Sequence, residues 1–76
     1  MVASAVALPV SSEQREVLER LSRSHTAPAR EVRQARALLW AAAGVPNAEI
    51  ARRCGSTPKS VRRWRARFDV EGLASV

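Results

Sequence analysis

Basic residues between Ile50 and Phe68 recur at intervals that would place them together on one face of a helix. This stretch contains seven Lys or Arg residues and no acidic residue. Positions i, i+3, i+4 and i+7 of one face are Lys59, Arg62, Arg63 and Ala66. Positions i, i+3 and i+7 of the opposite face are Val61, Trp64 and Phe68. A helix with a basic outer face and an apolar inner face accounts for both sets of intervals.

The chemistry that such a face offers is recognition of a nucleic acid. Arg and Lys donate hydrogen bonds to guanine O6 and N7 in the major groove of duplex DNA, and they also bind phosphates. We predict contacts with base edges from Thr57, Lys59, Arg62 and Arg63. We predict contacts with the DNA backbone from Ser60, Arg65, Arg67 and Arg53. The sequence leaves Arg52 open between phosphate and solvent.

A solvated Arg-rich helix in a protein-interaction module is the competing interpretation of this face, and RNA binding is a weaker one. A solvated helix is expected to intersperse acidic residues among the basic ones, and residues 52–67 contain none. Like charges one helical turn apart, such as Lys59 with Arg63, destabilise an isolated helix, and a bound polyanion would remove that repulsion. The charge pattern therefore favours DNA.

A short helix and a turn are expected to precede the basic face. Asn47 is expected to cap a helix over residues 48–54, and Gly55 to end it by adopting a positive φ. The positions expected to point inward from this helix are Ile50, Ala51 and Cys54. Cys54 is thus predicted to be a small buried hydrophobe and not a nucleophile.

The basic helix itself has a clear predicted start. Thr57 is expected to be its N-cap and Pro58 its first residue, because Pro lacks only an N–H that would have no partner there. The helix is expected to end near Val70. Two helices separated by residues 55–57 are typical of a helix-turn-helix, here over residues 47–70.

Two further helices are predicted before this unit. The first starts after Ser11, whose capping box includes Gln14, and ends near Ser24. The second extends from about Pro28 to Ala43. Its predicted apolar face consists of Val32, Ala35, Leu39 and Ala42, with Leu38 beside it. Residues 1–9 are predicted to be a flexible tail, and residues 10–76 to form one domain.

Composition sets the fold class and excludes several functions. The chain has 76 residues, a net charge of +6, 46% hydrophobic residues and a single Cys, so no internal disulfide is available. The net charge is +1 in residues 1–49 and +5 in residues 50–76. We predict an all-α bundle of about four helices with no catalytic residues, metal site, cofactor or small-molecule ligand. No signal peptide or membrane span is predicted, and a cytoplasmic location is expected.

Residues 8–76 resemble the N-terminal DNA-binding region of bacterial insertion-sequence transposases of the mariner-like DDE superfamily. The similar segments are "RALL" and "AAAG" at residues 36–39 and 41–44, "NAEIARRCG" at 47–55, "SVRRWRARF" at 60–68 and "EGLA" at 71–74. The most specific of these are the R-R-W-R-x-R-F run and the E-G-L that follows it.

The resemblance implies a homeodomain-like domain that recognises the terminal inverted repeats of its own insertion sequence during transposition, a form of DNA recombination. In that family a second DNA-binding subdomain and a metal-dependent catalytic domain follow, so we expect this chain to be a non-catalytic part of a larger protein. Any self-association is then expected to use parts of the parent protein that this chain lacks. A stand-alone transcriptional regulator remains the alternative, because one helix-turn-helix can serve either function. The E-G-L-A segment favours the transposase.

Overall fold

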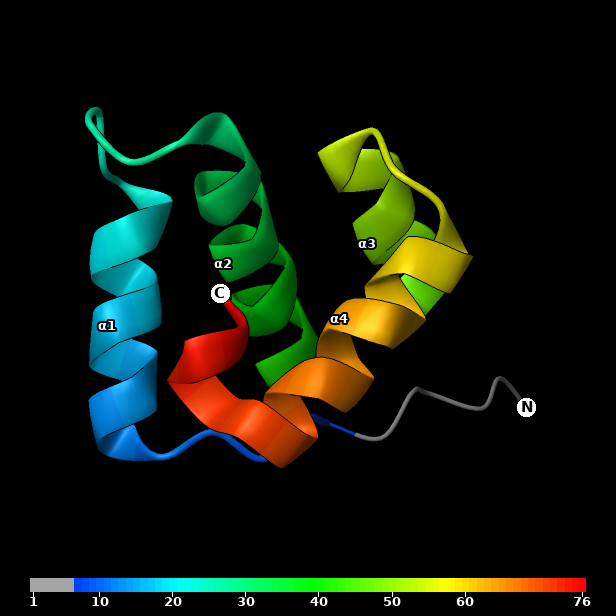
Figure 1. The fold of residues 1–76 in the computed structure, drawn as a ribbon. Helices are drawn as coiled ribbons and strands as arrows, with labels where there is room; N and C mark the ends of the chain where they lie inside the picture. The colour runs from blue at the N-terminus through cyan, green and yellow to red at the C-terminus, as the bar shows by residue number, and fades with distance from the viewer. Residues whose placement is uncertain (1–6) are drawn as a thin grey trace.

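The computed structural model describes residues 7–76, which form four α-helices and one short 3₁₀ helix (Figure 1). The helices are α1 (Ser12–Ser22), α2 (Ala29–Ala42), α3 (Asn47–Cys54) and α4 (Pro58–Glu71), and the 3₁₀ helix is η1 (Gly72–Ser75). No strand occurs among the described residues. The predicted all-α class is confirmed, and each predicted helix is present within two residues of its expected ends.

Helix α1 begins at the predicted capping box. The hydroxyl oxygen of Ser11 accepts a hydrogen bond from the N–H of Gln14 at 3.1 Å, and the Gln14 side-chain oxygen accepts one from the N–H of Ser11 at 3.0 Å. Together these bonds satisfy two backbone donors that no earlier turn can serve. Leu18 is the fully buried residue of α1, and it fixes this helix against α2.

Helix α2 lies at the centre of the bundle, where it contacts α1, α3 and α4 (Figure 1). Its buried residues are Ala35, Ala37, Leu38 and Ala41, so only Ala35 of the predicted face is buried. The other predicted residues, Val32, Leu39 and Ala42, are only partly buried. The prediction was therefore wrong about which face of α2 is buried. It assumed one apolar stripe, as in a helix that packs against a single neighbour, whereas three helices pack against α2.

The start of α3 differs from the prediction. The carbonyl of Pro46 accepts the first helical hydrogen bond, from the N–H of Ile50 at 3.0 Å, so Pro46 occupies the N-cap position and Asn47 is already helical. The side chain of Asn47 is directed elsewhere, since its Oδ1 accepts a hydrogen bond from Arg65 at 3.4 Å. A contact between two helices therefore uses the amide group that the sequence assigned to the cap.

The turn from α3 to α4 follows the prediction. Gly55 has a φ of 65°, and the next N–H, of Ser56, donates to the carbonyl of Ala51 at 2.8 Å. This pair of features is the Schellman arrangement that ends many helices, and it favours Gly because a side chain at positive φ is strained. Thr57 is the N-cap of α4 and Pro58 is its first residue.

The inner face of α4 closes the core. Val61 and Phe68 are buried, and Trp64 is partly buried against the same cluster. Gly72 ends α4 with a φ of 62°, and η1 then turns the chain back so that it approaches α1 and α2 in Figure 1. Leu73 and Val76 pack against the core, so the E-G-L-A segment belongs to the fold.

The segment before α1 is attached to the core at Leu8. This side chain is 6% exposed, and its N–H donates to the carbonyl of Ala41 at 3.0 Å. The expectation of a flexible tail through residue 9 does not hold at Leu8, because an apolar side chain with a bonded backbone stabilises the packed position. Residues 1–6 of the expected tail lie outside the described residues.

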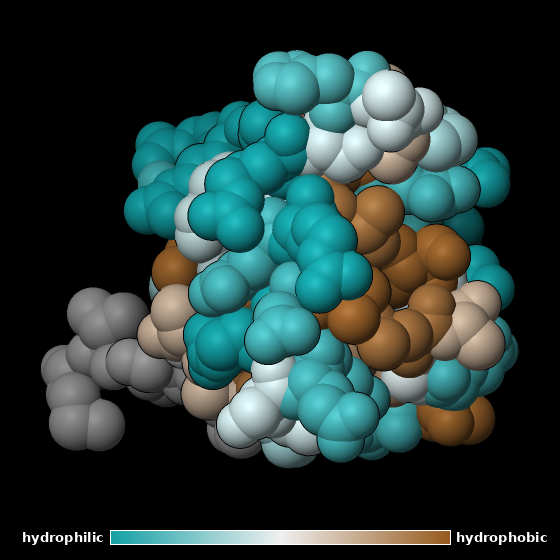
Figure 2. All heavy atoms as spheres, turned by 90° about the vertical axis from the view of Figure 1, so that its left-hand side faces the viewer, coloured by the Kyte–Doolittle hydropathy of each residue, from teal (hydrophilic) through white to brown (hydrophobic). Residues whose placement is uncertain are grey.

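The surface of α1 combines charged and apolar side chains. Figure 2 shows an apolar area on the side of the molecule where α1 lies, next to hydrophilic surface. Val17 and Leu21 of α1 are partly buried, and they line a shallow groove with Arg20 and Ser24. Across the described part of the chain, no helix has the length and apolar character needed to cross a membrane.

Candidate DNA-binding surface

The outer face of α4 presents cations without protein partners. Lys59, Arg62 and Arg63 are all exposed, and Ala66 lies exposed among them. None of these three cations forms an ion pair or hydrogen bond with another described residue. Their positive charge is therefore uncompensated on this face, which is the condition under which an approaching polyanion is most strongly attracted.

Thr57 and Ser60 are joined at the start of this face. The N–H of Ser60 donates to the hydroxyl oxygen of Thr57 at 3.2 Å, and the Thr57 hydroxyl lies 3.1 Å from that of Ser60. The cap satisfies one of the orphan N–H groups of the first turn. The remaining N–H groups of that turn and the positive end of the helix dipole lie beside Lys59, and both favour a negative ligand.

Arg65 and Arg67 differ from the cations of the outer face because each has a protein partner. The guanidinium of Arg65, which is partly buried, donates to Asn47 Oδ1 and so links α4 to the start of α3. Arg67 is exposed, and its guanidinium lies 3.8 Å from the carboxylate of Glu71 one turn later. An exposed pair of this kind contributes little stability, so Arg67 can exchange Glu71 for a phosphate at small cost.

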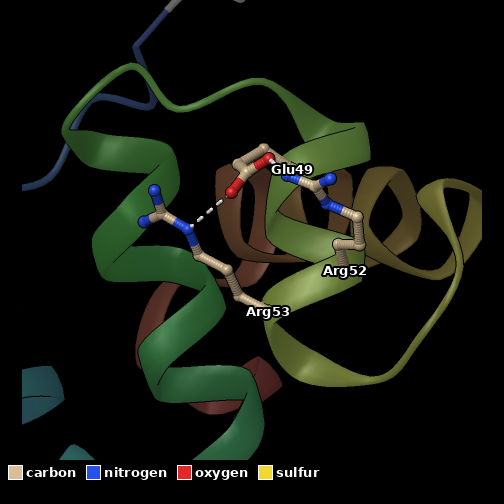
Figure 3. A network of polar contacts seen from close by, with 3 residues as sticks. All are labelled: Glu49, Arg52 and Arg53. Atoms are coloured by element: carbon tan, nitrogen blue, oxygen red, sulfur yellow. Dashed lines mark hydrogen bonds and ion pairs between the residues drawn. The ribbon is translucent and has the colours of Figure 1, made fainter.

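Helix α3 carries its own charge cluster, made of Glu49, Arg52 and Arg53 (Figure 3). Arg53 Nε donates to Glu49 Oε2 at 3.1 Å, and Arg52 donates to Glu49 Oε1. The hydrogen bonds from Arg53 and Arg52 lower the pKa of Glu49, because they stabilise its charged form. The two basic residues at the end of α3 are thus partly neutralised by one carboxylate.

Arg53 is also held against α2. Its guanidinium carbon lies 5.2 Å from the ring centroid of Trp40, a distance typical of a cation–π contact. Arg53 and Trp40 line a pocket together with residues of α2, among them Arg33 and Arg36, and no residue of α4 lines it. In the view of Figure 3, Arg53 lies in the foreground and the faint orange-brown ribbon of α4 lies behind α3. Arg53 is therefore separate from the cations of the outer face of α4.

Cys54 lines the same pocket, so it is only partly buried and the prediction of a buried hydrophobe holds in part. Its thiol lies 3.9 Å from the carbonyl oxygen of Arg33. Burial raises the pKa of the Cys54 thiol, although the positive charges of Arg33 and Arg36 act in the opposite direction. A thiol with a raised pKa is a poor nucleophile at neutral pH.

The structure brings most of the predicted site residues onto one element. Seven of the eight lie on α4 or at its N-cap: Thr57, Lys59, Ser60, Arg62, Arg63, Arg65 and Arg67. Arg53 is the exception, on α3. Sequence reasoning missed the partners of Arg53 and Arg65. The ion pair between Glu49 and Arg53 could have been predicted from their i, i+4 spacing. The hydrogen bond between Asn47 and Arg65 could not, because these residues are 18 positions apart and no local pattern links them.

The family comparison agrees with this geometry. Residues 28–76, from the start of α2 to the end of η1, match the model of the homeodomain-like domain. The chain belongs to this family, and it is a helix-turn-helix domain that binds double-stranded DNA. Helix α1 precedes the matched residues. Comparisons with curated proteins and with solved structures found no match.

Proposed function

We propose that α4 enters the major groove of duplex DNA and recognises a specific sequence there. The observation that carries this proposal is the group of three exposed, unpartnered cations on its outer face, Lys59, Arg62 and Arg63. In helix-turn-helix proteins the second helix lies in the major groove, with its N-terminal residues nearest the base edges. Arg62 and Arg63 are suited to bidentate contacts with guanine, because a guanidinium donates two parallel hydrogen bonds.

Contacts with the DNA backbone complete the proposed complex. Ser60, Arg65 and Arg67 flank the outer face and would bind phosphates on its two sides. Such contacts fix the position of a recognition helix without carrying sequence information. Arg53, which lies over Trp40, would bind a phosphate only where the DNA extends past α3.

The biological role that we propose is recognition of the terminal inverted repeats of an insertion sequence by a transposase. The support for this role is the resemblance of residues 8–76 to the DNA-binding region of such enzymes. The E-G-L-A segment has a packing role in the structure, because Leu73 contributes to the core. The presence of this segment is therefore evidence for the shared fold, and it says less about whether the protein acts in transposition. A transcriptional regulator with the same fold would keep the same packing.

Selection of bound sites from a pool of random duplexes tests the proposal. The expected result is a short enriched sequence that recurs at both ends of the insertion sequence that encodes the protein. The matched control is Arg62→Ala together with Arg63→Ala, which should abolish the enrichment while the protein remains folded. Enrichment of a sequence found only upstream of the gene would favour the regulator, and no enrichment at all would contradict sequence-specific recognition.

A further inference from the structure

A pocket of about 400 Å³ lies where the linker between α1 and α2 meets one face of α2 and the end of α3. We call it the basic pocket. The residues that define it are Val32, Arg33, Arg36 and Trp40 of α2 with Arg53 and Cys54 of α3. Three of these are arginines, and no acidic residue of the described chain lines the pocket. No residue of α4 lines it either, so this surface is separate from the candidate DNA-binding face.

Two helices bring the three arginines of the basic pocket together. Arg36 and Trp40 lie three and seven residues after Arg33, so all three share one face of α2. Arg53 extends from α3 toward α2 (Figure 3), and its guanidinium lies over the Trp40 ring. Three guanidinium groups therefore border a single cavity.

The protein compensates little of this charge. The guanidinium of Arg33 forms no ion pair or hydrogen bond with another described residue, and that of Arg36 donates to a neutral acceptor, the carbonyl of Ser22, at 3.2 Å. Only Arg53 has a carboxylate partner, Glu49, which lies outside the pocket lining. Cations gathered in this way repel one another, so the pocket favours an anionic ligand.

The thiol of Cys54 lies where the fields of these arginines converge. Burial raises the pKa of this thiol, and the positive charges of Arg33 and Arg36 both oppose that shift. Two cations of α2 thus act on a group of α3 at the opposite wall, which indicates that their positive potential extends into the pocket.

The apolar part of the lining decides which anion fits best. Val32, Trp40 and Cys54 are only partly buried, so they leave apolar surface beside the arginines. A DNA backbone would satisfy the charge, but it would leave this apolar surface without a matching group. An acidic peptide segment offers both chemistries, because its carboxylates accept bidentate hydrogen bonds from arginine and a neighbouring apolar side chain covers the apolar surface. The rise along α2 from Arg33 to Trp40, about 10 Å, matches about three extended residues of such a segment.

We propose that the basic pocket binds a short acidic segment of a partner protein. Carboxylates of the segment pair with Arg33 and Arg36, and an apolar residue between them packs against Trp40. This inference goes beyond the proposed function and does not rest on it, since the pocket and the outer face of α4 share no residue. The domain would therefore hold DNA and the partner at the same time.

Selection from a library of displayed random heptapeptides, with the full chain as the target, tests this proposal. The expected result is enrichment of peptides in which acidic residues flank an apolar one. In a fluorescence-anisotropy titration with an enriched peptide, Arg33→Gln should weaken binding about fivefold, the effect of one exposed ion pair. Arg30→Gln is the matched control, because Arg30 is exposed on the same helix but does not line the pocket, and its affinity should match the wild type.

Cys54 gives a second readout that locates the bound peptide. It is the single Cys of the chain and it lines the pocket, so a saturating concentration of the peptide should slow its reaction with a thiol reagent. Both variants should fold, because Arg30 and Arg33 are exposed and Gln is a good helix former.

Several results would overturn the proposal. They are the absence of enriched acidic peptides, equal affinity of Arg33→Gln and the wild type for an enriched peptide, and an unchanged reaction rate of Cys54 when that peptide is bound. Weaker binding of Arg33→Gln to the selected duplex, with no peptide enriched, would assign the pocket to a contact with the DNA backbone. Each of these results leaves recognition by α4 intact, because that proposal is tested by Arg62 and Arg63 on DNA.

Discussion

Thr57 and Ser60 share two hydrogen bonds at the start of α4, so the two hydroxyl groups have different freedom to bind DNA. The Thr57 oxygen accepts from the N–H of Ser60 at 3.2 Å, and its hydroxyl donates to the Ser60 oxygen at 3.1 Å. In this arrangement the hydroxyl proton of Ser60 remains available for a phosphate. The proton of Thr57 is already used, and a contact of Thr57 with a base would have to use its remaining lone pair or a rotated hydroxyl.

Replacement of the cap, Thr57→Ala, should lower the free energy of unfolding by about 1 kcal/mol, the usual contribution of an N-cap hydrogen bond. Thr57→Ser keeps the hydroxyl and should retain most of the stability. Urea denaturation followed by circular dichroism measures both variants. Equal stability of Thr57→Ala and the wild type would mean that the cap does not hold the start of α4 in solution.

Removal of either central arginine, by Arg62→Ala or Arg63→Ala, should weaken binding to the selected duplex by about 1–3 kcal/mol and relax the preference at particular base pairs. The physical reason is the loss of a bidentate contact that only one base satisfies. Arg20→Ala is the matched control, because Arg20 is exposed on α1, away from α4. Equal weakening for all sequences would show that these arginines bind phosphates and not bases.

Binding to duplex DNA should depend steeply on salt. If roughly four to six phosphates are neutralised, the logarithm of the association constant should fall against the logarithm of salt concentration with a slope of about −4 to −5. A fluorescence-anisotropy titration at several salt concentrations measures this slope. A protein-interaction module would show no measurable duplex binding at low salt, and that result would be incompatible with the DNA-binding surface described above.

Acid should weaken the contacts that Glu49 makes. The pKa of Glu49 is lowered by its hydrogen bonds with Arg53 and Arg52, so its carboxylate stabilises the folded state above its unfolded-state pKa. That contribution is lost as the pH falls through the folded-state pKa. In an NMR titration, Arg53→Ala should raise the pKa of Glu49 toward its ordinary value. Glu49→Gln should remove this part of the pH dependence of stability, and an unchanged dependence would contradict the assignment.

The packing of Leu8 predicts that residues before α1 contribute to stability. Leu8→Ala should lower the free energy of unfolding by about 2–5 kcal/mol, because it leaves a cavity in the core cluster to which the buried Leu8 side chain belongs. Val70→Ala is the control, since an exposed side chain should change stability by no more than about 0.5 kcal/mol. Thermal or chemical denaturation measures both. If Leu8→Ala were as stable as the wild type, this segment would not be part of the core.

The sequence was sufficient where the deciding interactions are local. The capping box of Ser11 and Gln14 spans three residues, and the start of α4 depends only on Thr57, Pro58 and Ser60. The positive φ of Gly55 likewise follows from its place between two amphipathic segments. Because such interactions are complete within one helical turn, these three helix ends and the outer face of α4 could be predicted from spacing alone.

The tertiary structure decided what depends on distant partners. Which face of α2 is buried follows from three helices that surround it, and no period in its own sequence contains that information. Leu8 joins the core because Ala41 offers a carbonyl 33 residues later, and Asn47 binds Arg65 instead of capping α3. The sequence by itself thus determined the helix-turn-helix and its basic face, whereas the fold determined which polar groups are left unpartnered to meet DNA.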